Sequence, residues 1–231
     1  MHTKIKITAA ALALAACGWA CRVGADAINQ VIPAPAVDTP AAEATGPQTA
    51  VLAGGCFWGL QGMFEHVQGV TKVVAGYSGG SAETAQYDTV STETTGHAES
   101  VEITFDPKKI SYGQLLRLYF AVAHNPTELN RQGPDHGTSY RSEIFFNSPD
   151  QEKVAKAYVD QLTQAKIFKQ PIVTKIEPLK GFYKAEDYHQ DFLIHNPHHG
   201  YIVVNDLPKI AALKHYYPEL YSEKPVMVTA R

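Results

Sequence analysis

The chain has few cysteines, no long hydrophobic run and no excess of charge of one sign. Its 231 residues contain three cysteines, Cys17, Cys21 and Cys56, which are too few for a disulfide scaffold. The apolar stretch at residues 7–16 is too short to span a bilayer core of roughly 30 Å as a helix. With 20 basic and 23 acidic residues, the chain lacks the strongly basic composition of an electrostatic nucleic-acid binder.

Residues 1–25 have the pattern of an export signal, in which two lysines precede the apolar stretch and small residues follow it. Two cleavage sites are open. The sequence Leu-Ala-Ala-Cys ending at Cys17 resembles a bacterial lipoprotein box, where the cysteine would be lipidated. The sequence Val-Gly-Ala before Asp26 would instead release the protein without an anchor. In both cases we expect export, either into the bacterial periplasm or as a lipoprotein that faces it.

The rest of the chain divides into a tether, one domain and a tail. Residues 26–48 are rich in alanine and proline and contain no aromatic residue, which favours an extended tether. Residues 49–217 carry enough apolar and aromatic side chains for one core. Residues 218–231 form a C-terminal tail. We expect no nucleic-acid partner, membrane contact only through the lipid, and a monomer.

Strands and helices alternate irregularly along the domain. Hydrophobic patterning predicts strands at Thr49–Gly54, Val70–Tyr77, Glu99–Phe105, Arg141–Asn147, Ile172–Glu177 and Gly200–Val204. It predicts helices at Phe57–Val67, Ser111–His124, Ser148–Ala165, Glu186–Ile194 and Leu207–Tyr216. A loop is expected between the second and third strands. This irregular order predicts an α+β fold, a two-layer sandwich with a mixed sheet in a single domain.

The domain's single thiol, Cys56, falls at a predicted junction between a strand and a helix, directly after two glycines. The partial positive charge of a helix N-terminus stabilises a thiolate, so we expect the pKa of Cys56 to lie below about 8.5. Phe57 and Trp58 place an aromatic surface beside the sulfur. A buried structural cysteine is the commoner fate of a free thiol, but a reactive thiol is a liability in an oxidising compartment, which favours a functional role here.

Several motifs in order resemble the peptide methionine sulfoxide reductase A family, across roughly residues 49–217. They are Gly55-Cys56-Phe57-Trp58-Gly59, Tyr87, Gly96-His97-Ala98-Glu99, Asp135-His136-Gly137-Thr138-Ser139-Tyr140-Arg141-Ser142, Glu186-Asp187-Tyr188-His189-Gln190 and Asn196-Pro197. The resemblance implies reduction of methionine-S-sulfoxide, free or protein-bound, with no metal, flavin or nucleotide cofactor.

The resemblance assigns the two central roles to Cys56 and Glu99. Cys56 would attack the sulfoxide sulfur and become a sulfenic acid. Glu99 would protonate the departing oxygen. A carboxyl group can do so at neutral pH only if burial raises its pKa from about 4.3 towards 6 or 7. A solvent-facing strand glutamate is the ordinary alternative for Glu99.

The resemblance also implies the residues around the substrate. Tyr87 and Tyr140 would donate hydrogen bonds to the sulfoxide oxygen. Phe57 and Trp58 would enclose the S-methyl group, and an aromatic face would favour the sulfur as it becomes partly cationic. Asp135 would belong to the polar network around the substrate.

The sequence departs from the family pattern at the C-terminal side of the domain. Many members carry a second cysteine after a Gly-Tyr pair, but Ile202 stands there and no cysteine follows. An external thiol, a thioredoxin-like protein or a small dithiol, is therefore expected to regenerate Cys56. One exception is open: Cys21 lies 35 residues before Cys56, and a flexible segment of that length reaches on the order of 30 Å.

Two other functions fit parts of the sequence. A cysteine hydrolase or acyl transferase would pair Cys56 with one of the domain histidines and form an acyl-enzyme. A metal-binding protein would use the cluster His189, His195, His198 and His199, although Asn196-Pro197 interrupts any common helical face and no second cysteine contributes.

Overall fold

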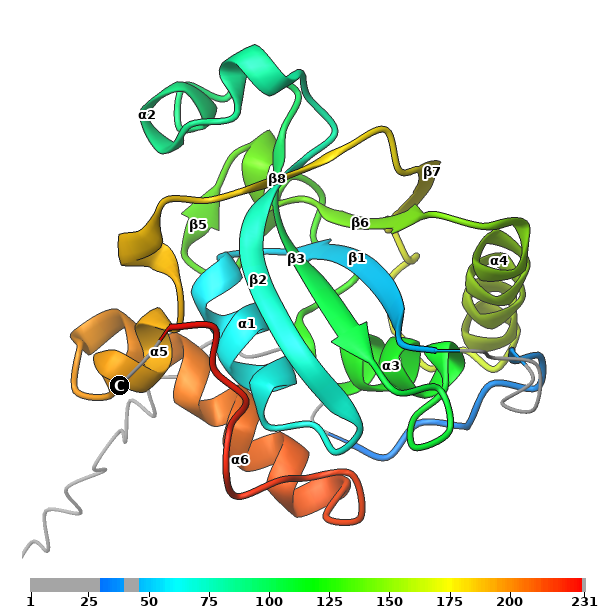
Figure 1. The fold of residues 1–231 in the computed structure, drawn as a ribbon. Helices are drawn as coiled ribbons and strands as arrows, with labels where there is room; N and C mark the ends of the chain where they lie inside the picture. Colours follow the sequence, from blue (N-terminus) through cyan, green and yellow to red (C-terminus); the bar gives the residue numbers. More distant parts are fainter. Residues whose placement is uncertain (1–29, 40–45, 230–231) are drawn as a thin grey trace, which may run out of the picture.

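A six-stranded sheet lies at the centre of the computed structural model, which describes residues 30–39 and 46–229 (Figure 1). The strand order is β7-β6-β1-β3-β2-β8. The strands are β1 (Gln48–Gly54), β2 (Val70–Ser78), β3 (Ala98–Phe105), β6 (Ser142–Phe146), β7 (Lys175–Pro178) and β8 (Phe182–Lys184). β4 (Arg131–Gln132) and β5 (Asp135–His136) form a separate small hairpin.

Helical segments connect the strands. The α-helices are α1 (Phe57–Glu65), α2 (Tyr87–Val90), α3 (Tyr112–Leu118), α4 (Pro149–Gln164), α5 (Phe192–His195) and α6 (Leu207–Tyr216). Short 3-10 or π-helical turns are η2 (Ala82–Thr84), η3 (Tyr119–Ala123), η4 (Thr138–Tyr140), η5 (Asp187–His189) and η6 (Ile202–Asp206). Within the described ranges, no helix is both long and apolar enough to cross a bilayer.

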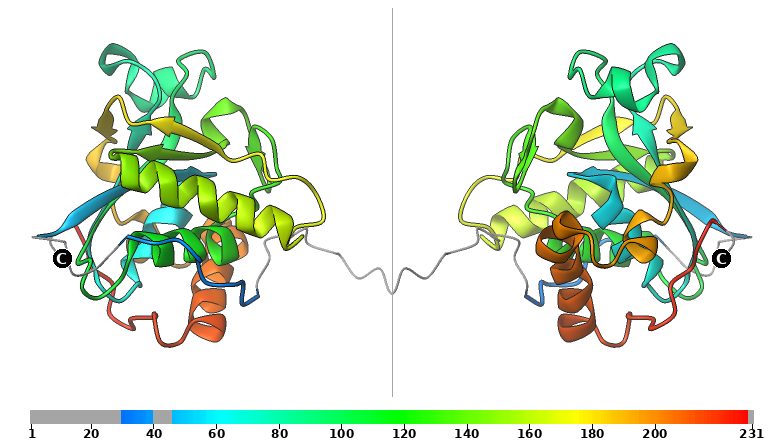
Figure 2. Two further views of the ribbon diagram at one scale, coloured as in Figure 1. Left: turned by 90° about the vertical axis from the view of Figure 1, so that its right-hand side faces the viewer. Right: turned by 90° about the vertical axis from the view of Figure 1, so that its left-hand side faces the viewer.

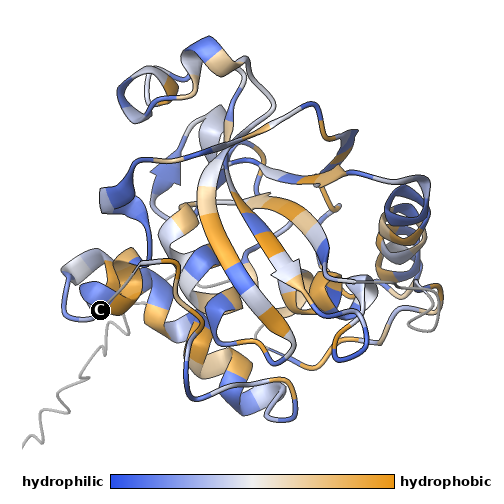
Figure 3. Cartoon of the chain, viewed as in Figure 1, coloured by the Kyte–Doolittle hydropathy of each residue, from blue (hydrophilic) through white to orange (hydrophobic). Residues whose placement is uncertain are grey.

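The sheet is mixed: β6 and β7 pair in parallel, and all other neighbouring strands of the sheet pair antiparallel. Successive residues of β1 face opposite sides: Ala50 and Leu52 join the main core under the helices, whereas Val51 and Ala53 join a smaller cluster on the other face. In Figure 3 the hydrophobic colour is concentrated in β2, β3 and the helices beside them. The predicted α+β fold, with a mixed sheet in one domain, is confirmed.

Most predicted elements form close to their expected ends. Ser111 caps α3 as predicted, since its hydroxyl accepts a hydrogen bond from Gln114 N–H while the Gln114 side chain accepts one from Ser111 N–H. Ser148 caps α4 in the same way through Gln151 N–H, and Pro149 stands at the helix start. These local signals set where the two helices begin.

The predicted strand at Gly200–Val204 is wrong, because this segment is helical and continues through η6 into α6. Ile202 is fully buried while Val203 and Val204 are 46% and 56% exposed, which is how the sides of a helix differ. A run of β-branched residues favours a strand locally, and packing of Ile202 into the core overrides that preference. The predicted strand at Ile172–Glu177 is shifted to β7, and the expected loop between β2 and β3 contains η2 and α2.

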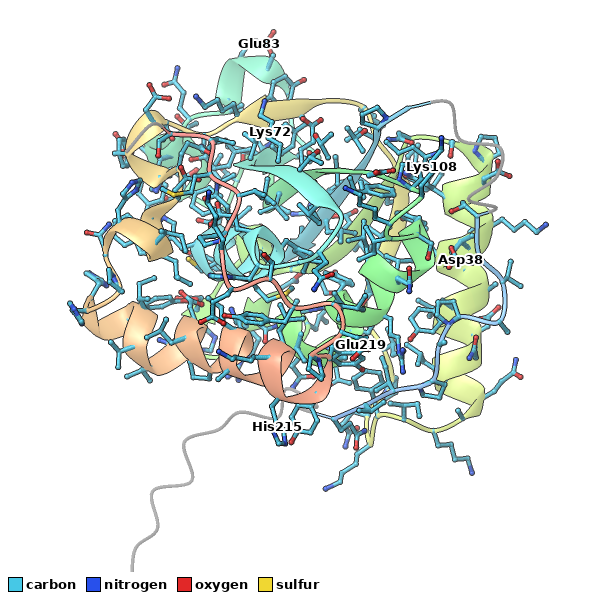
Figure 4. The ribbon with its side chains drawn as sticks, turned by 60° about the horizontal axis from the view of Figure 1, so that its bottom comes forward. Asp38, Lys72, Glu83, Lys108, His215 and Glu219 are labelled. Atoms are coloured by element: carbon cyan, nitrogen blue, oxygen red, sulfur yellow. The ribbon has the colours of Figure 1, made fainter. Side chains whose placement is uncertain are left out.

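The described part of the predicted tether packs against the domain. Ile32 is buried, and its carbonyl accepts a 2.8 Å hydrogen bond from Arg117 Nε of α3. Asp38 accepts the Gly113 N–H at 2.9 Å and also the Ser111 hydroxyl, at the start of α3. In Figure 2 residues 30–39, in blue, run along α3, and Figure 4 shows Asp38 beside α3 and α4. The predicted signal sequence, with Cys17 and Cys21, lies outside the described residues.

The C-terminal tail also packs on the domain. Tyr221 forms a bridge with Val67 just beyond the end of α1. The backbone N–H groups of Val228 and Thr229 donate to the carboxylate of Asp191. The tail therefore fastens the C-terminal end of α1 and the segment before α5, both of which support the site described next.

Candidate active site

A small open pocket of about 170 Å³ lies at the N-terminal end of α1. It brings together all seven residues that the sequence analysis selected, and one more. Its lining consists of Cys56, Phe57, Trp58, Tyr87, Glu99, Asp135, Tyr140 and Tyr201. These residues come from α1, α2, β3, β5, η4 and the turn before η6, so the fold gathers them from most of the domain's length.

Cys56 is the N-cap residue of α1, as the sequence predicted. Gly55 before it has φ +91°, and a Cβ there would meet the Gln132 side chain 2.5 Å away, so this tight turn requires glycine. Cys56 is 9% exposed at the edge of the pocket. The sharp turn therefore places Cys56 at the N-terminal end of α1, whose first residues form one wall of the pocket.

The predicted lowering of the Cys56 pKa is wrong. Burial raises the pKa of Cys56 well above its ordinary value, and the carboxyl groups of Glu99 and Asp206 raise it further. The hydrogen bond from the Trp58 backbone and the charge of Lys209 act in the opposite direction but do not outweigh burial. Desolvation of the anion thus exceeds the stabilisation from the helix N-terminus, and the resting group is a thiol at neutral pH.

Glu99 lies on β3, near its start, and is 4% exposed. Its Oε2 accepts a 3.0 Å hydrogen bond from the backbone N–H of Phe57, the residue after Cys56. Burial raises the pKa of Glu99 to about 8, against the lowering effect of that hydrogen bond. The carboxyl group therefore carries a proton at neutral pH beside the thiol, as a general acid requires.

Phe57 and Trp58 form an aromatic wall supported from behind by η5 and α5. Trp58 stacks on Phe192 with ring centroids 3.9 Å apart, and its Nε1–H donates to Nδ1 of His189 at 3.0 Å. The ring of Phe57 lies 4.9 Å from that of His189. His189, from the Glu-Asp-Tyr-His-Gln motif, therefore orients both aromatic residues of the wall.

Tyr87 and Tyr140 are positioned by carboxylates outside the pocket. Glu186 accepts the backbone N–H of Tyr87 at 2.9 Å. Glu93 accepts the backbone N–H of Ser139 at 2.8 Å and so fixes η4, which ends at Tyr140. Burial raises the pKa of both phenols, so each keeps its proton and can donate a hydrogen bond without carrying charge.

Tyr201 is the pocket residue that the sequence analysis missed. Its hydroxyl donates to Oδ2 of Asp135, and its ring meets the edge of Trp58 with centroids 6.1 Å apart. Burial raises the pKa of Asp135, and the bond from Tyr201 opposes that rise. The position of Tyr201 after Asn196-Pro197 was the available signal, but a segment predicted as a strand gave no reason to place it here.

The two alternative functions find no support in the described residues. No histidine lines the pocket beside Cys56, as a cysteine hydrolase would require. Across residues 30–39 and 46–229, no group of three or more His, Cys, Asp or Glu side chains is arranged to hold a metal ion. His189 instead bonds Trp58, and His199 packs edge-on against Trp58 and Phe192.

A comparison with family models matches residues 48–220 to the peptide methionine sulfoxide reductases. The chain belongs to this family. A relative from Mesorhizobium japonicum, named peptide methionine sulfoxide reductase MsrA 2, is 62% identical over 185 residues, covering 80% of this chain and 95% of that protein. Another MsrA 2, from Synechocystis, is 50% identical over 207 residues, covering 87% and 97%.

Solved structures agree with this assignment to the peptide methionine sulfoxide reductases. The reduced form of Mxr1 from Saccharomyces cerevisiae matches with a TM-score of 0.59 and 33% identity, over 66% of this chain and 87% of that one. Methionine sulfoxide reductase A of Corynebacterium diphtheriae matches with a TM-score of 0.57 and 32% identity, over 75% and 87%. The chain is thus an oxidoreductase, a peptide-methionine (S)-S-oxide reductase.

Proposed function

We propose that this reductase works through a sulfenic acid on Cys56, with Glu99 as the proton donor. The observation that carries the proposal is the placement of a buried thiol and a buried, protonated carboxyl group in one pocket, connected through the Phe57 N–H. A sulfoxide oxygen is a poor leaving group until it is protonated. A nucleophile and an uncharged acid side by side therefore match what the reaction needs.

The substrate S-methyl group would pack against Phe57 and Trp58, with the sulfoxide oxygen towards Glu99 and the two phenols. As Glu99 protonates the oxygen, the substrate sulfur gains positive character. An aromatic face then stabilises it by roughly 0.5 to 2 kcal/mol. Tyr87 and Tyr140 would hold the oxygen by hydrogen bonds, so the bound pose aligns the sulfur with Cys56.

The redox step transfers one oxygen atom and two electrons. The Cys56 sulfur attacks the substrate sulfur, Glu99 gives its proton to the oxygen, and the thiol proton replaces it on Glu99. The oxygen passes to Cys56 as a sulfenic acid, and methionine leaves in reduced form. The substrate sulfur is reduced by two electrons and the cysteine sulfur is oxidised by two, so no metal or flavin is needed.

Regeneration would use an external thiol, because the sequence contains no cysteine after Cys56. One thiol condenses with the sulfenic acid to a mixed disulfide and releases water, and a second thiol reduces that disulfide. A thioredoxin-like protein or another dithiol supplies both thiols in one molecule. Oxidised proteins and free methionine sulfoxide are the proposed substrates.

A sulfenic-acid probe tests this mechanism. Cys56 should be labelled only after methionine-S-sulfoxide is added without reductant, and Cys56→Ser should lose both labelling and turnover. No labelling after the sulfoxide is added, together with an acyl-enzyme formed from ester substrates, would favour the hydrolase instead.

Export is proposed on the pattern of residues 1–25. The intact mass of the mature protein from its native host distinguishes the cleavage sites. A lipid on Cys17 or a start at Asp26 supports export, and an unprocessed Met1 contradicts it.

A further inference from the structure

A buried ion pair lies against the helix that begins at Cys56. Asp206 of η6 is fully buried, and its Oδ1 accepts a 2.9 Å hydrogen bond from Lys209 Nζ of α6, whose side chain is 15% exposed. Asp206 Oδ2 has no hydrogen-bond partner. A buried pair of this kind contributes little to stability compared with apolar side chains of the same volume. Stability alone therefore does not explain why two charged residues occupy this position.

The pair touches α1 at Gly59. A Cβ added to Gly59 would overlap Asp206 Oδ1 and would lie 2.6 Å from Lys209 Nζ. Gly59 comes three residues after Cys56, so both occupy the same face of α1 about one turn apart, roughly 5 Å along the axis. The charges of both groups act on the Cys56 thiol, and only a glycine at position 59 lets the two side chains approach the backbone of α1.

The other groups around Cys56 are acidic or neutral. Carboxyl groups face it from Glu99, Asp135 and Asp206, and phenols from Tyr87, Tyr140 and Tyr201. His124 packs behind Gly54, but burial lowers its pKa to about 3, so it carries no charge. Of all the groups named here around Cys56, Lys209 is the single cation.

A thiolate in this pocket loses its water shell, so a cation within one helical turn has a large influence on it. The charge of Lys209 lowers the pKa of Cys56, and it also lowers the pKa of Asp135. The charge of Asp206 raises the pKa of Cys56. The two members of the pair therefore act on the thiol in opposite directions.

We propose that Lys209, held by Asp206, is a positioning residue that stabilises the anionic form of Cys56 as the sulfur attacks. This inference rests on the proposed role of Cys56 as the nucleophile. Asp206 fixes the ammonium against Gly59, and its own negative charge limits how much anion the resting site contains. Burial remains the main cause of the raised pKa of Cys56, Asp206 adds to it, and Lys209 supplies the counter-ion when the anion forms.

The test measures the rate at which iodoacetamide alkylates Cys56 between pH 6.5 and 10, in the full-length protein. Mass spectrometry of the peptide containing Cys56 separates it from Cys17 and Cys21. Lys209→Met should slow alkylation at pH 8 about tenfold, and Asp206→Asn should accelerate it, because thiolate content follows the pKa. Lys209→Arg should restore the wild-type profile.

Opposite effects separate this proposal from a structural role, since breaking a merely structural pair perturbs the site in one direction from either side. Effects of the same sign, or an unchanged profile in either variant, would overturn it. Lys209→Gln keeps a donor to Asp206 and replaces Lys209→Met if that variant unfolds. The matched control is the exposed pair Glu152–Lys156 on α4, where Lys156→Met and Glu152→Gln should leave alkylation unchanged.

The readout does not depend on catalysis. If Cys56→Ser kept its reductase activity, the proposed function would fail while the alkylation profiles still reported on Lys209. If alkylation ignored Lys209 while Cys56→Ser was inactive, only this inference would fail.

Discussion

Glu99 and Phe57 are joined by a 3.0 Å hydrogen bond from the Phe57 backbone N–H to Oε2 of the carboxyl group. Because Phe57 follows Cys56, this bond fixes the proton donor relative to the nucleophile. It also occupies Oε2, which leaves Oε1 to carry the proton. The relationship ties the start of β3 to the start of α1, 42 residues apart in sequence.

Replacing Glu99 by Gln should slow methionine formation roughly 10² to 10⁴-fold in a single turnover, the range for a positioned general acid. The amide keeps an oxygen to accept the Phe57 N–H but has no acidic proton. Rapid-quench measurement of methionine gives the rate. Glu102→Gln, on the same strand but outside the pocket, should behave as wild type. A wild-type rate in the Glu99→Gln variant would show that another group donates the proton.

The pH dependence of kcat/KM should follow Glu99. Its pKa of about 8 means that the donor is protonated below pH 8 and lost above it, so kcat/KM should fall as pH rises past about 8. The raised pKa of Cys56 means that thiol ionisation does not produce a rising limb at lower pH. A profile that instead climbed through pH 9 would assign control to the thiol, and Glu99→Gln should lack the alkaline fall.

Tyr201→Phe should reduce kcat/KM about tenfold, equivalent to about 1.4 kcal/mol of transition-state stabilisation. The change removes the hydroxyl that donates to Asp135, which leaves a partly buried carboxyl group without its partner at the pocket wall. Steady-state kinetics with a methionine sulfoxide peptide measures the loss. Tyr216→Phe on α6, outside the pocket, is the matched control. Identical kcat/KM values for the two variants would show that the Tyr201 hydroxyl does not contribute to the reaction.

Glu65 at the end of α1 should make stability depend on pH. Burial and the neighbouring Asp191 carboxylate raise its pKa to about 10 in the folded protein, against an ordinary 4.5. The folded state thus holds a proton that the unfolded chain releases. This contribution is complete below about pH 4.5 and is lost as pH rises towards 10.

Glu65→Gln should therefore flatten the decline of the unfolding free energy between pH 6 and about 9, as measured by urea denaturation. The exposed Glu219→Gln (Figure 4) should leave that slope unchanged. A wild-type free energy that rises across this interval would contradict the raised pKa of Glu65.

The sequence predicted the fold where local signals and burial agree. β1 and β3 have clear hydrophobic patterns and end at Gly or Pro signals, and α4 begins at a Ser-Pro signal, so all three form where expected. The prediction for residues 200–204 was wrong because three β-branched residues favour a strand locally, while packing of Ile202 into the core favours a helix. That error also concealed Tyr201, which reaches the pocket only because the segment is helical.

The site residues came from the family motifs, and the structure brings all of them into one pocket. The pKa of Cys56 could not be predicted, because sequence shows the helix start but not the burial of the sulfur or the carboxyl groups opposite it. The raised pKa of Glu99 was predicted in direction, since its role requires it. Asp206 and Lys209 lie about 150 residues from Cys56, and no local pattern connects them with it.

The most direct test of the central claim is the stoichiometry of methionine formation without any reductant. Purified, fully reduced protein mixed with excess methionine-S-sulfoxide should form one methionine per chain and then stop, with one added oxygen atom on Cys56. Continued turnover, or methionine formed while Cys56 stays a free thiol, would contradict the account, as would a disulfide between Cys21 and Cys56 in place of the sulfenic acid.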